Sequence, residues 1–208
     1  MNNNITIVDY GCGNSASIRN MLKKIGHPSI ISSDPVIIAE SDKLILPGVG
    51  SFDHGMKKLE EFDLISVLNE RALTHKTPIL GICLGVQLFC KKSDEGMREG
   101  LGWIDAEVVK FDRERLSDSQ KVPHMGWGDT RVTRVNKLIA SNDEIPRYYY
   151  VHSYHLDCRD QDLILSTATH GYKFVSSIEQ GNILGVQFHP EKSHRFGMAL
   201  LKNFAEKY

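Results

Sequence analysis

The sequence predicts an α/β fold: a three-layer structure in which a mostly parallel, mixed sheet carries helices on both faces. In the first half of the chain, short apolar runs alternate with amphipathic helical patterns, as in successive β-α-β units. These runs are almost wholly apolar, which is typical of parallel strands covered on both faces. In the second half, strand-like runs follow one another without helices long enough for crossovers. This change predicts antiparallel hairpins added to the far side of the sheet.

Four strands and the helices between them are expected in the first half. The strands are NITIVDY at 4–10, SIIS at 29–32, KLIL at 43–46 and PILGIC at 78–83. Asn14 caps a first helix that ends at Gly26, because apolar residues recur there at helical spacing. Asp34, followed by proline, opens a short second helix. Residues 53–75 have the pattern of two helices, and residues 84–92 that of one more.

The second half contains six expected strands and a final helix. The strands are 103–111, 129–135, 147–154, 163–169, 173–178 and 183–188, and the helix is 195–206. The polar segment 112–121 is expected to be an exposed loop. Because no linker, repeat or low-complexity segment separates the two halves, we expect a single domain over residues 1–208.

Composition and charge exclude several classes of protein. The 208 residues are 41% hydrophobic and 25% charged, as in ordinary globular proteins, and the net charge is −1. This balance gives no electrostatic basis for binding nucleic acid or a membrane surface. The apolar stretches are too short to span a bilayer, and the first residues lack the pattern of a signal peptide. Four cysteines without CxxC or disulfide spacing favour a cytoplasmic protein, and no histidine–cysteine spacing suggests a metal site.

A cysteine stands where the fourth strand ends and a helix begins. Cys83 lies in Gly-Ile-Cys-Leu-Gly, between Gly81 and Gly85. Such an elbow holds a nucleophile in a strained turn, and small flanking residues let the chain bend sharply. At a helix N-terminus the dipole favours a thiolate, and the N–H of Leu84 is placed to stabilise an oxyanion. A buried cysteine in a tight turn is an alternative of equal weight.

A base and a carboxylate for this thiol are available near the end of the chain. His189 and Glu191 follow an apolar strand in GVQFHPEKS. Because they are two residues apart, an extended chain places both on one side, and Pro190 stiffens the step. The carboxylate can then hold one imidazole nitrogen while the other faces the sulfur. Taken alone, His-Pro-Glu is more often a loop with a solvated acid.

A third motif, PGVG at 47–50, also follows a buried strand. In a parallel sheet this loop and the cysteine elbow lie at the same carboxyl edge, where open α/β proteins bind ligands. The backbone N–H groups of Gly48, Val49 and Gly50 can complete an oxyanion hole. Taken alone, the tetrapeptide is more often a Pro-Gly turn without a ligand.

Together the three motifs resemble the class I, or triad, glutamine amidotransferase family. The resemblance extends along nearly the whole chain through DYG with GN, PGVGSF, LGICLGVQ, EGLGW, KVPHMGW, YVHSY and GVQFHPEKS. It implies the family's flavodoxin-like α/β fold. It also implies the family's reaction, in which a cysteine forms a thioester with L-glutamine and the released ammonia passes to a synthase. We expect no cofactor and no metal.

The resemblance assigns a role to each matching position. It makes Cys83 the nucleophile, His189 the acid and base, and Glu191 the orienter of the histidine. The oxyanion positions are Gly48, Val49, Gly50 and Leu84. The segments that hold glutamine include Gln87, His152, Ser153 and Tyr154. The positions near the face that meets the synthase are Lys192, Trp127 and Tyr149.

Within the family, the motifs are most similar to the branch that supplies ammonia for imidazole glycerol phosphate synthesis in the histidine pathway. The resemblance therefore implies a heterodimer with a barrel-shaped cyclase. Two features leave the ammonia acceptor open. Gly128 stands where that branch usually has Asn, and the tail at 194–197 is similar to a branch found beside surface-polysaccharide genes. That branch is expected to supply nitrogen to an amino or amidino sugar.

Two other classes of protein are alternatives. A cysteine hydrolase of peptidase-like α/β architecture can also place its thiol in a Gly-x-Cys-x-Gly elbow, although it does not need both PGVG and His-Pro-Glu. A non-catalytic binding subunit could keep the fold without the chemistry. The presence of Cys83, His189 and Glu191 in one chain counts against that second alternative. Assays of glutamine hydrolysis and of peptide cleavage separate the classes.

Overall fold

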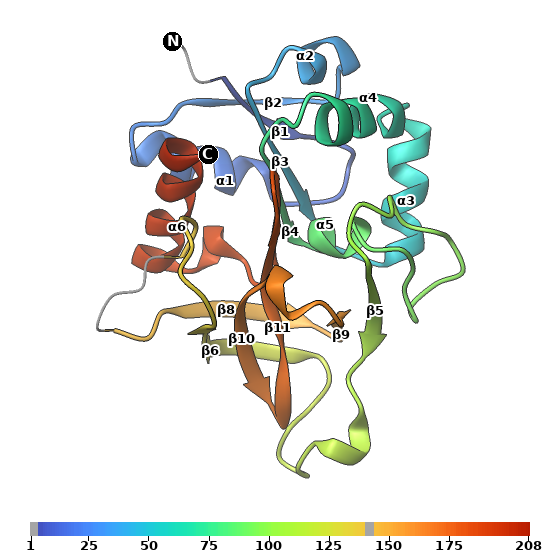
Figure 1. Cartoon of the computed structure of the whole chain (residues 1–208), viewed down its shortest axis with the longest axis vertical. Coiled ribbons are helices and arrows are strands. Elements are labelled where there is room, and N and C mark those ends of the chain that lie inside the picture. The colour runs from blue at the N-terminus through green and yellow to red at the C-terminus, as the bar shows by residue number, and fades with distance from the viewer. Residues whose placement is uncertain (1–3, 140–143) are drawn as a thin grey trace.

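Strands and helices alternate through the first half of the computed structural model, which describes residues 4–139 and 144–208 (Figure 1). The strands are β1 (Ile5–Val8), β2 (Ser29–Ser32), β3 (Lys43–Gly48) and β4 (Ile79–Cys83). The helices are α1 (Ser15–Lys24), α2 (Pro35–Ala39), α3 (Phe52–Glu61), α4 (Ile65–Asn69), a π-helical turn (Glu70–Thr74) and α5 (Leu84–Leu88). The side chains of Asn14 and Asp34 cap α1 and α2, as the sequence predicts.

The second half adds mainly strands. They are β5 (Ala106–Lys110), β6 (His124–Asp129), β7 (Arg131–Val132), β8 (Arg147–His152), β9 (Tyr154–Cys158), β10 (Ile164–His170), β11 (Tyr172–Gln180) and β12 (Ile183–Val186). Short 3₁₀ turns occur at Arg113–Arg115, Gln161–Leu163 and Pro190–Lys192. The chain closes with α6 (His194–Lys207).

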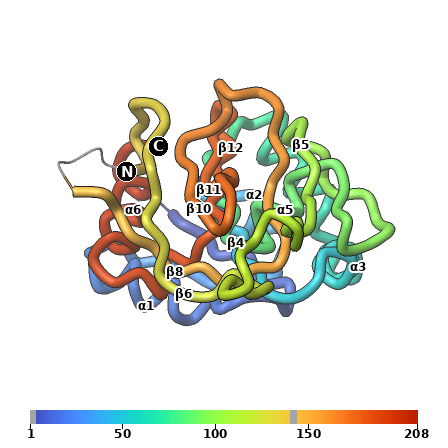
Figure 2. The backbone as a smooth tube through the Cα atoms, turned by 90° about the horizontal axis from the view of Figure 1, so that it is seen from below, coloured from blue at the N-terminus to red at the C-terminus, as the bar shows by residue number. Residues whose placement is uncertain are grey.

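The main sheet is parallel at its centre and antiparallel at one side. Its strand order is β2-β1-β3-β4-β12-β11-β10-β7, with β5 and β9 attached through β11. The strands from β2 to β12 run parallel, whereas β11 and β10 form antiparallel hairpins beyond β12. The view from below shows these strands beside the ribbon of β6 and β8 (Figure 2). The expected mixed sheet is therefore confirmed.

Two apolar cores lie on opposite faces of the sheet, because successive side chains of a strand point in opposite directions. In β3, Leu44 and Leu46 belong to the core under α3, α4 and α5, whereas Ile45 belongs to the core under α1 and α6. Figure 1 shows the same division, with α1 and α6 on one side of the sheet and α3, α4 and α5 on the other. The three-layer arrangement follows directly from this alternation.

The ribbon formed by β6 and β8 differs from the expectation. The sequence predicts no strand at 122–128, but His124–Asp129 pairs antiparallel with Arg147–His152 in a separate two-stranded sheet. Glycines at positions 126 and 128 interrupt the alternation of side chains by which a strand is recognised in a sequence.

In the described part of the chain, every helix falls short of the length and apolar character that a membrane span needs.

Candidate active site

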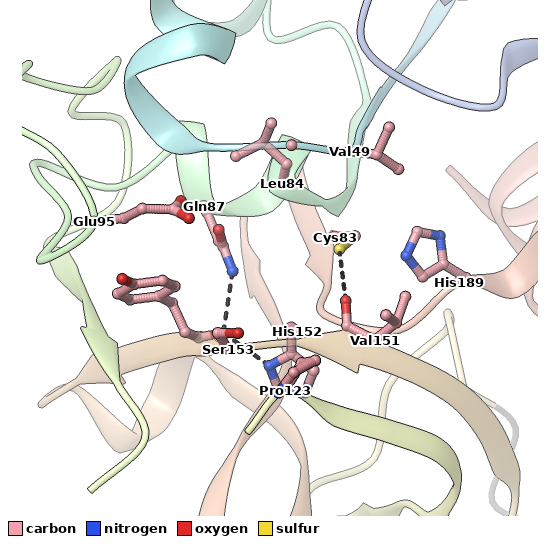
Figure 3. A pocket seen from close by; sticks show the side chains of 12 residues that line it. Val49, Cys83, Leu84, Gln87, Glu95, Pro123, Val151, His152, Ser153 and His189 are labelled. Atoms are coloured by element: carbon pink, nitrogen blue, oxygen red, sulfur yellow. Dashed lines mark hydrogen bonds between the residues drawn. The ribbon is translucent and has the colours of Figure 1, made fainter. Parts of the chain in front are cut away.

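Three parallel strands end at the same edge of the sheet and bring the three motifs together. β4 lies between β3 and β12 and pairs in register with both, Cys83 with Gly48 and Ile82 with Val186. The loops that follow these strands therefore lie side by side, although they are far apart in the sequence. Figure 3 shows the resulting site, with Cys83 and His189 close together and Val49 above them.

Cys83 has the strained backbone of a nucleophile elbow. Its φ is 55° and its ψ is −110°, which a residue with a Cβ adopts only where its surroundings enforce it. The flanking glycines permit close packing. A Cβ on Gly85 would lie 1.9 Å from the carbonyl oxygen of Leu46, and one on Gly81 would lie 2.6 Å from the Phe89 ring. The sequence thus locates the elbow correctly, but the bend itself falls on the cysteine.

The backbone of His189 is fixed by β8 and by the start of α6. His189 N donates to the carbonyl oxygen of Tyr149 at 2.9 Å. Ser193 Oγ donates to His189 O at 2.6 Å and accepts from Tyr149 N at 3.0 Å. Glu191 does not lie in an extended segment, as the sequence suggests, but in the 3₁₀ turn that follows His189. That turn brings the carboxylate back onto the imidazole.

His189 and Glu191 form a buried pair. The distance from His189 Nδ1 to Glu191 Oε1 is 2.8 Å, and both side chains are 2% exposed. Burial opposes a charged ring, but the Cys83 sulfur and the Glu191 carboxylate outweigh it and raise the pKa of His189 to about 10. The other ring nitrogen, Nε2, has no hydrogen-bond partner among the described residues. The site therefore holds a proton-donating imidazole beside the sulfur.

A cavity of about 290 Å³ opens next to Cys83. It is lined by Val49, Gly50, Cys83, Leu84, Gln87, Glu95, Pro123, Val151, His152, Ser153, Tyr154 and His189 (Figure 3). The lining includes the expected nucleophile and base, and all the positions expected to hold glutamine. Among the expected oxyanion positions, Gly48 is not part of it. Gly48 pairs with Cys83 in the sheet, packed against Tyr10 and Leu84.

A chain of side-chain amides connects the cavity wall with the sulfur. Gln87 Nε2 donates to Tyr154 O at 3.2 Å and to Gln187 Oε1 at 3.1 Å. Gln187 Nε2 in turn lies 3.8 Å from Cys83 Sγ and donates to it. Both amide hydrogens of Gln87 are thus used inside the protein. Its carbonyl oxygen is the atom that Gln87 offers to a ligand in the cavity.

A buried pair of histidines, His124 and His152, supports the part of the cavity wall that Ser153 and Tyr154 form. His152 Nδ1 donates to Tyr154 O at 2.8 Å, which leaves its Nε2 to accept from His124 Nδ1 at 3.2 Å. Burial lowers the pKa of both rings, that of His124 to about 4, where nearby His170 contributes as well. Both rings are therefore neutral near pH 7. The pair fixes the backbone of the Ser153–Tyr154 segment, which borders the cavity.

The three residues expected at a partner face lie next to one another. Lys192 Nζ lies 5.7 Å from the centre of the Tyr149 ring, and that ring meets Trp127 edge-on at 6.2 Å. Trp127 also stacks on His194 at 5.5 Å and is 41% exposed. The structure thus gathers these residues at one surface beside the site. Their role in binding a partner stays a prediction.

Two residues of the site were missed by the sequence analysis. Gln187 stands only two positions before His189, so its place beside the motif was the available signal. Glu95 comes from the segment after α5, where it is one of several acidic residues and nothing in the sequence distinguishes it. Within residues 4–139 and 144–208, no group of three or more His, Cys, Asp and Glu side chains could hold a metal ion.

A thiol, an imidazole and a carboxylate thus meet at the carboxyl edge of a mostly parallel sheet, which places the chain among α/β proteins with a cysteine–histidine–carboxylate cluster. The chain belongs to the class-I glutamine amidotransferase family: the family model described as "Glutamine amidotransferase class-I" matches residues 6–208. It is therefore a glutamine amidotransferase.

Curated relatives narrow this assignment. The chain is 50% identical over 203 residues to imidazole glycerol phosphate synthase subunit HisH 2 of Methanococcus maripaludis, covering 98% of this chain and 99% of the relative. It is 45% identical over 202 residues to subunit HisH 2 of Pseudomonas aeruginosa, covering 97% and 98%. Within the family, the chain thus falls into the group of HisH subunits.

Solved structures of other members share the fold. The structure of PurLQS from Thermotoga maritima has a TM-score of 0.72 at 16% identity and covers 98% of both chains. A glutamine amidotransferase from the same organism has a TM-score of 0.62 at 18% identity, covering 92% of this chain and 77% of that one. At these identities the likeness concerns the fold alone.

Proposed function

We propose that the chain is the glutaminase subunit of an imidazole glycerol phosphate synthase and that Cys83, His189 and Glu191 are its catalytic triad. The observation that carries the proposal is the meeting of a strained cysteine with a buried, carboxylate-paired imidazole beside a small cavity. The names and high identities of the HisH relatives support the pathway.

The geometry suits amide hydrolysis through a thioester. Cys83 Sγ attacks the side-chain amide carbon of glutamine, and its proton resides on His189 Nε2. The oxyanion is stabilised by backbone N–H groups of the loop residues Val49 and Gly50 and of Leu84, which line the cavity. His189 Nε2 then protonates the departing nitrogen, which leaves as ammonia, and a γ-glutamyl thioester remains. Water gives a proton back to His189 as it attacks, and glutamate and the free thiol are released.

The far wall of the cavity suits the α-amino-acid end of glutamine. Glu95 places a carboxylate there, which attracts the α-ammonium group. Gln87 offers a carbonyl oxygen, and the Ser153–Tyr154 segment closes the remaining side. In Figure 3 Glu95 lies at one end of the lining and Cys83 lies toward the other, with Gln87 between them, so a molecule with an ammonium at one end and an amide at the other suits this arrangement.

Released ammonia is useful only if it does not become protonated in bulk water, so the reaction calls for a partner that receives it. We propose a barrel-shaped cyclase that forms a heterodimer with this chain. The surface formed by Lys192, Trp127 and Tyr149 is the proposed place of contact. We place the complex in the cytoplasm. All four cysteines are buried and free, which suits a reducing compartment.

Replacement of the nucleophile tests the proposal. In the complex with the cyclase, Cys83→Ala is expected to abolish glutamine-dependent synthesis. Added ammonium salt should still support synthesis, because the cyclase needs only the nitrogen. The measurement is the rate of product formation with each nitrogen donor. Glutamine-dependent turnover by a clean variant would contradict the assignment, and loss of both activities would indicate a damaged complex.

One observation favours an alternative ammonia acceptor, outside the histidine pathway. Gly128 lies next to Trp127 in β6, and a Cβ there would lie 3.0 Å from the Tyr150 ring, so the larger Asn of the histidine branch fits only if that ring shifts. The same glutaminase chemistry would then feed an amino- or amidino-sugar synthase. Purified chain and its own cyclase, assayed with both acceptors, decide between the two.

A further inference from the structure

The helix that follows the oxyanion loop is capped from a distant segment. Ser51, the residue that precedes α3, makes no side-chain cap hydrogen bond. Instead Glu95 Oε2 accepts from Phe52 N, the first N–H group of α3, at 2.8 Å. A carboxylate at a helix N-terminus is stabilised by the helix dipole and satisfies a free donor. Glu95 therefore connects the cavity wall to the end of the loop at 48–51.

A second carboxylate makes the reciprocal contact. Asp53, in the first turn of α3, accepts from Met97 N at 3.1 and 3.0 Å and from Arg98 N at 3.0 Å. These backbone bonds lower the pKa of Asp53, that from Met97 first. Asp53 stays ionised throughout the neutral range. Two carboxylates thus bind the segment at 95–98 to α3: Glu95 accepts from the helix, and Asp53 accepts from the segment. We call this arrangement the reciprocal carboxylate contacts.

The fit at the intervening residue is close. A Cβ on Gly96 would lie 1.9 Å from Asp53 Oδ1 and 2.3 Å from Asp53 Cγ. Glycine at 96 is therefore required for the reciprocal carboxylate contacts, because any side chain there would push the Asp53 carboxylate away. Glu95 N and Gly96 N also donate locally to Ser93, to its Oγ at 3.1 Å and to its carbonyl oxygen at 3.3 Å. Arg98 forms an ion pair with Glu60 at 2.6 Å, and these two side chains are 39% and 52% exposed. Such an exposed pair contributes little.

We propose that Asp53 is a positioning residue for glutamine hydrolysis: by fixing the 95–98 segment, it holds the Glu95 carboxylate in the glutamine cavity and on the helix that follows the oxyanion loop. Asp53 touches no reacting atom. The inference rests on the proposed function, since it explains how the ammonium end of the cavity and the oxyanion loop keep a common geometry.

The test uses the complex with the cyclase. Asp53→Ala is expected to raise the KM for glutamine about tenfold, because Glu95 then loses its support, and to lower kcat by less than about threefold. Asp53→Asn keeps one acceptor oxygen and should recover most of the loss. Glu60→Ala, which removes the exposed ion pair of the same segment, is the matched control and should leave KM unchanged. Ammonia-dependent synthesis should be the same in all variants.

Gly96→Ala provides an independent arm. In the wild-type background it should reproduce the rise in KM, because the new methyl displaces Asp53. In the Asp53→Ala background it should add little, since the carboxylate is already gone. Additive effects, an unchanged KM in Asp53→Ala, or an equal fall in ammonia-dependent synthesis would each overturn the proposal. Failure of the wild-type complex to release glutamate would instead refute the proposed function, whatever Asp53 does.

Discussion

At the scale of single residues, His189 is the group whose surroundings most clearly predict its behaviour. Its ring is 2% exposed, donates to a carboxylate and has a pKa raised to about 10. A buried histidine without such partners would be neutral, because burial disfavours charge. The ring can therefore hold a proton and still face the sulfur, as an acid for the leaving ammonia requires.

This reasoning ranks two substitutions. In the complex, His189→Ala is expected to lower kcat/KM for glutamine about 1,000-fold, and Glu191→Gln about 30-fold, because an amide still orients the ring. The measurement is glutamate release at saturating partner. The reverse order would show that Glu191 itself transfers the proton.

The same two residues set a pH dependence. Since the protonated ring is needed, the alkaline limb of the kcat/KM profile should lie near pH 10 in the wild type, following the His189 pKa of about 10. Glu191→Gln removes a negative charge that favours the imidazolium, so this limb should move to lower pH. A limb that stays in place would mean that another group controls it.

At the scale of elements, α5 packs so closely on the sheet that its second residue, Gly85, has no room for a side chain. The Cβ of an alanine at 85 would lie 1.9 Å from the backbone oxygen of Leu46, which cannot move without moving β3. The elbow at Cys83 and the helix after it are thus positioned by packing on the strand that carries PGVG. Local strain at the cysteine is maintained by this packing.

Gly85→Ala is therefore expected to lower the free energy of unfolding by about 3 kcal/mol. Gly55→Ala serves as the comparison, because the nearest atoms there are the terminal methyl carbons of Leu84 and Leu88 at 3.1 and 3.2 Å, which can shift more easily than backbone. It should cost less than about 1 kcal/mol. Denaturant unfolding of the isolated chains measures both, and equal losses would contradict the packing argument.

His124, in the ribbon of β6 and β8, makes the stability of the folded chain depend on pH under acidic conditions. His124 has a folded pKa of about 4 against an ordinary value of 6.5. Between these values the unfolded chain binds a proton that the folded chain does not. This difference contributes about 2 kcal/mol to the free energy of unfolding, after allowance for screening by solvent. The contribution is complete above about pH 6.5 and is lost as the pH falls toward 4.

His124→Asn tests this directly, because asparagine keeps a donor toward His152 but does not titrate. Near pH 7 the variant should unfold at nearly the same denaturant concentration as the wild type. Near pH 5 it should lose less stability than the wild type does. Parallel pH curves for the two chains would show that His124 is not the responsible group.

At the scale of the whole molecule, the proposed heterodimer with a cyclase would seal the site. Val49, in the proposed oxyanion loop, is 45% exposed, and Trp127, Tyr149 and Lys192 lie together at the surface proposed for the partner. A partner seated there would exclude water from the site and strengthen its electrostatic interactions. Such coupling would also prevent glutamine from being hydrolysed when no acceptor is bound.

The isolated chain is therefore expected to hydrolyse glutamine about a hundredfold more slowly than the heterodimer. Lys192→Glu should weaken binding of the cyclase without changing the thermal stability of the chain, since this lysine is exposed. Titration of the partner against glutamate release checks both expectations. Comparable rates with and without the cyclase would remove the idea of activation.

The sequence by itself determined the strands other than β6 and β9, the order of the helices, the cysteine elbow and the His-Pro-Glu segment. These features depend on local patterns: apolar periodicity, caps and the residues that flank a turn. The family resemblance rests on the same short motifs. The glycines beside Cys83 indicated the right position, although in the structure they allow close packing and the bend itself lies at the cysteine. The prediction still held because a tight turn and close packing both require small residues.

Only the tertiary structure decided which distant groups meet. The register of β4 with β3 and β12 places Cys83 beside the loops that carry Val49 and His189. Cys83 and Glu191 then outweigh the burial of His189 and raise its pKa, and Asp53 binds the segment that carries Glu95 to the cavity. Such contacts join residues far apart in the chain, and their strength depends on desolvation and on distances of a few tenths of an ångström. No local pattern in a sequence encodes those quantities.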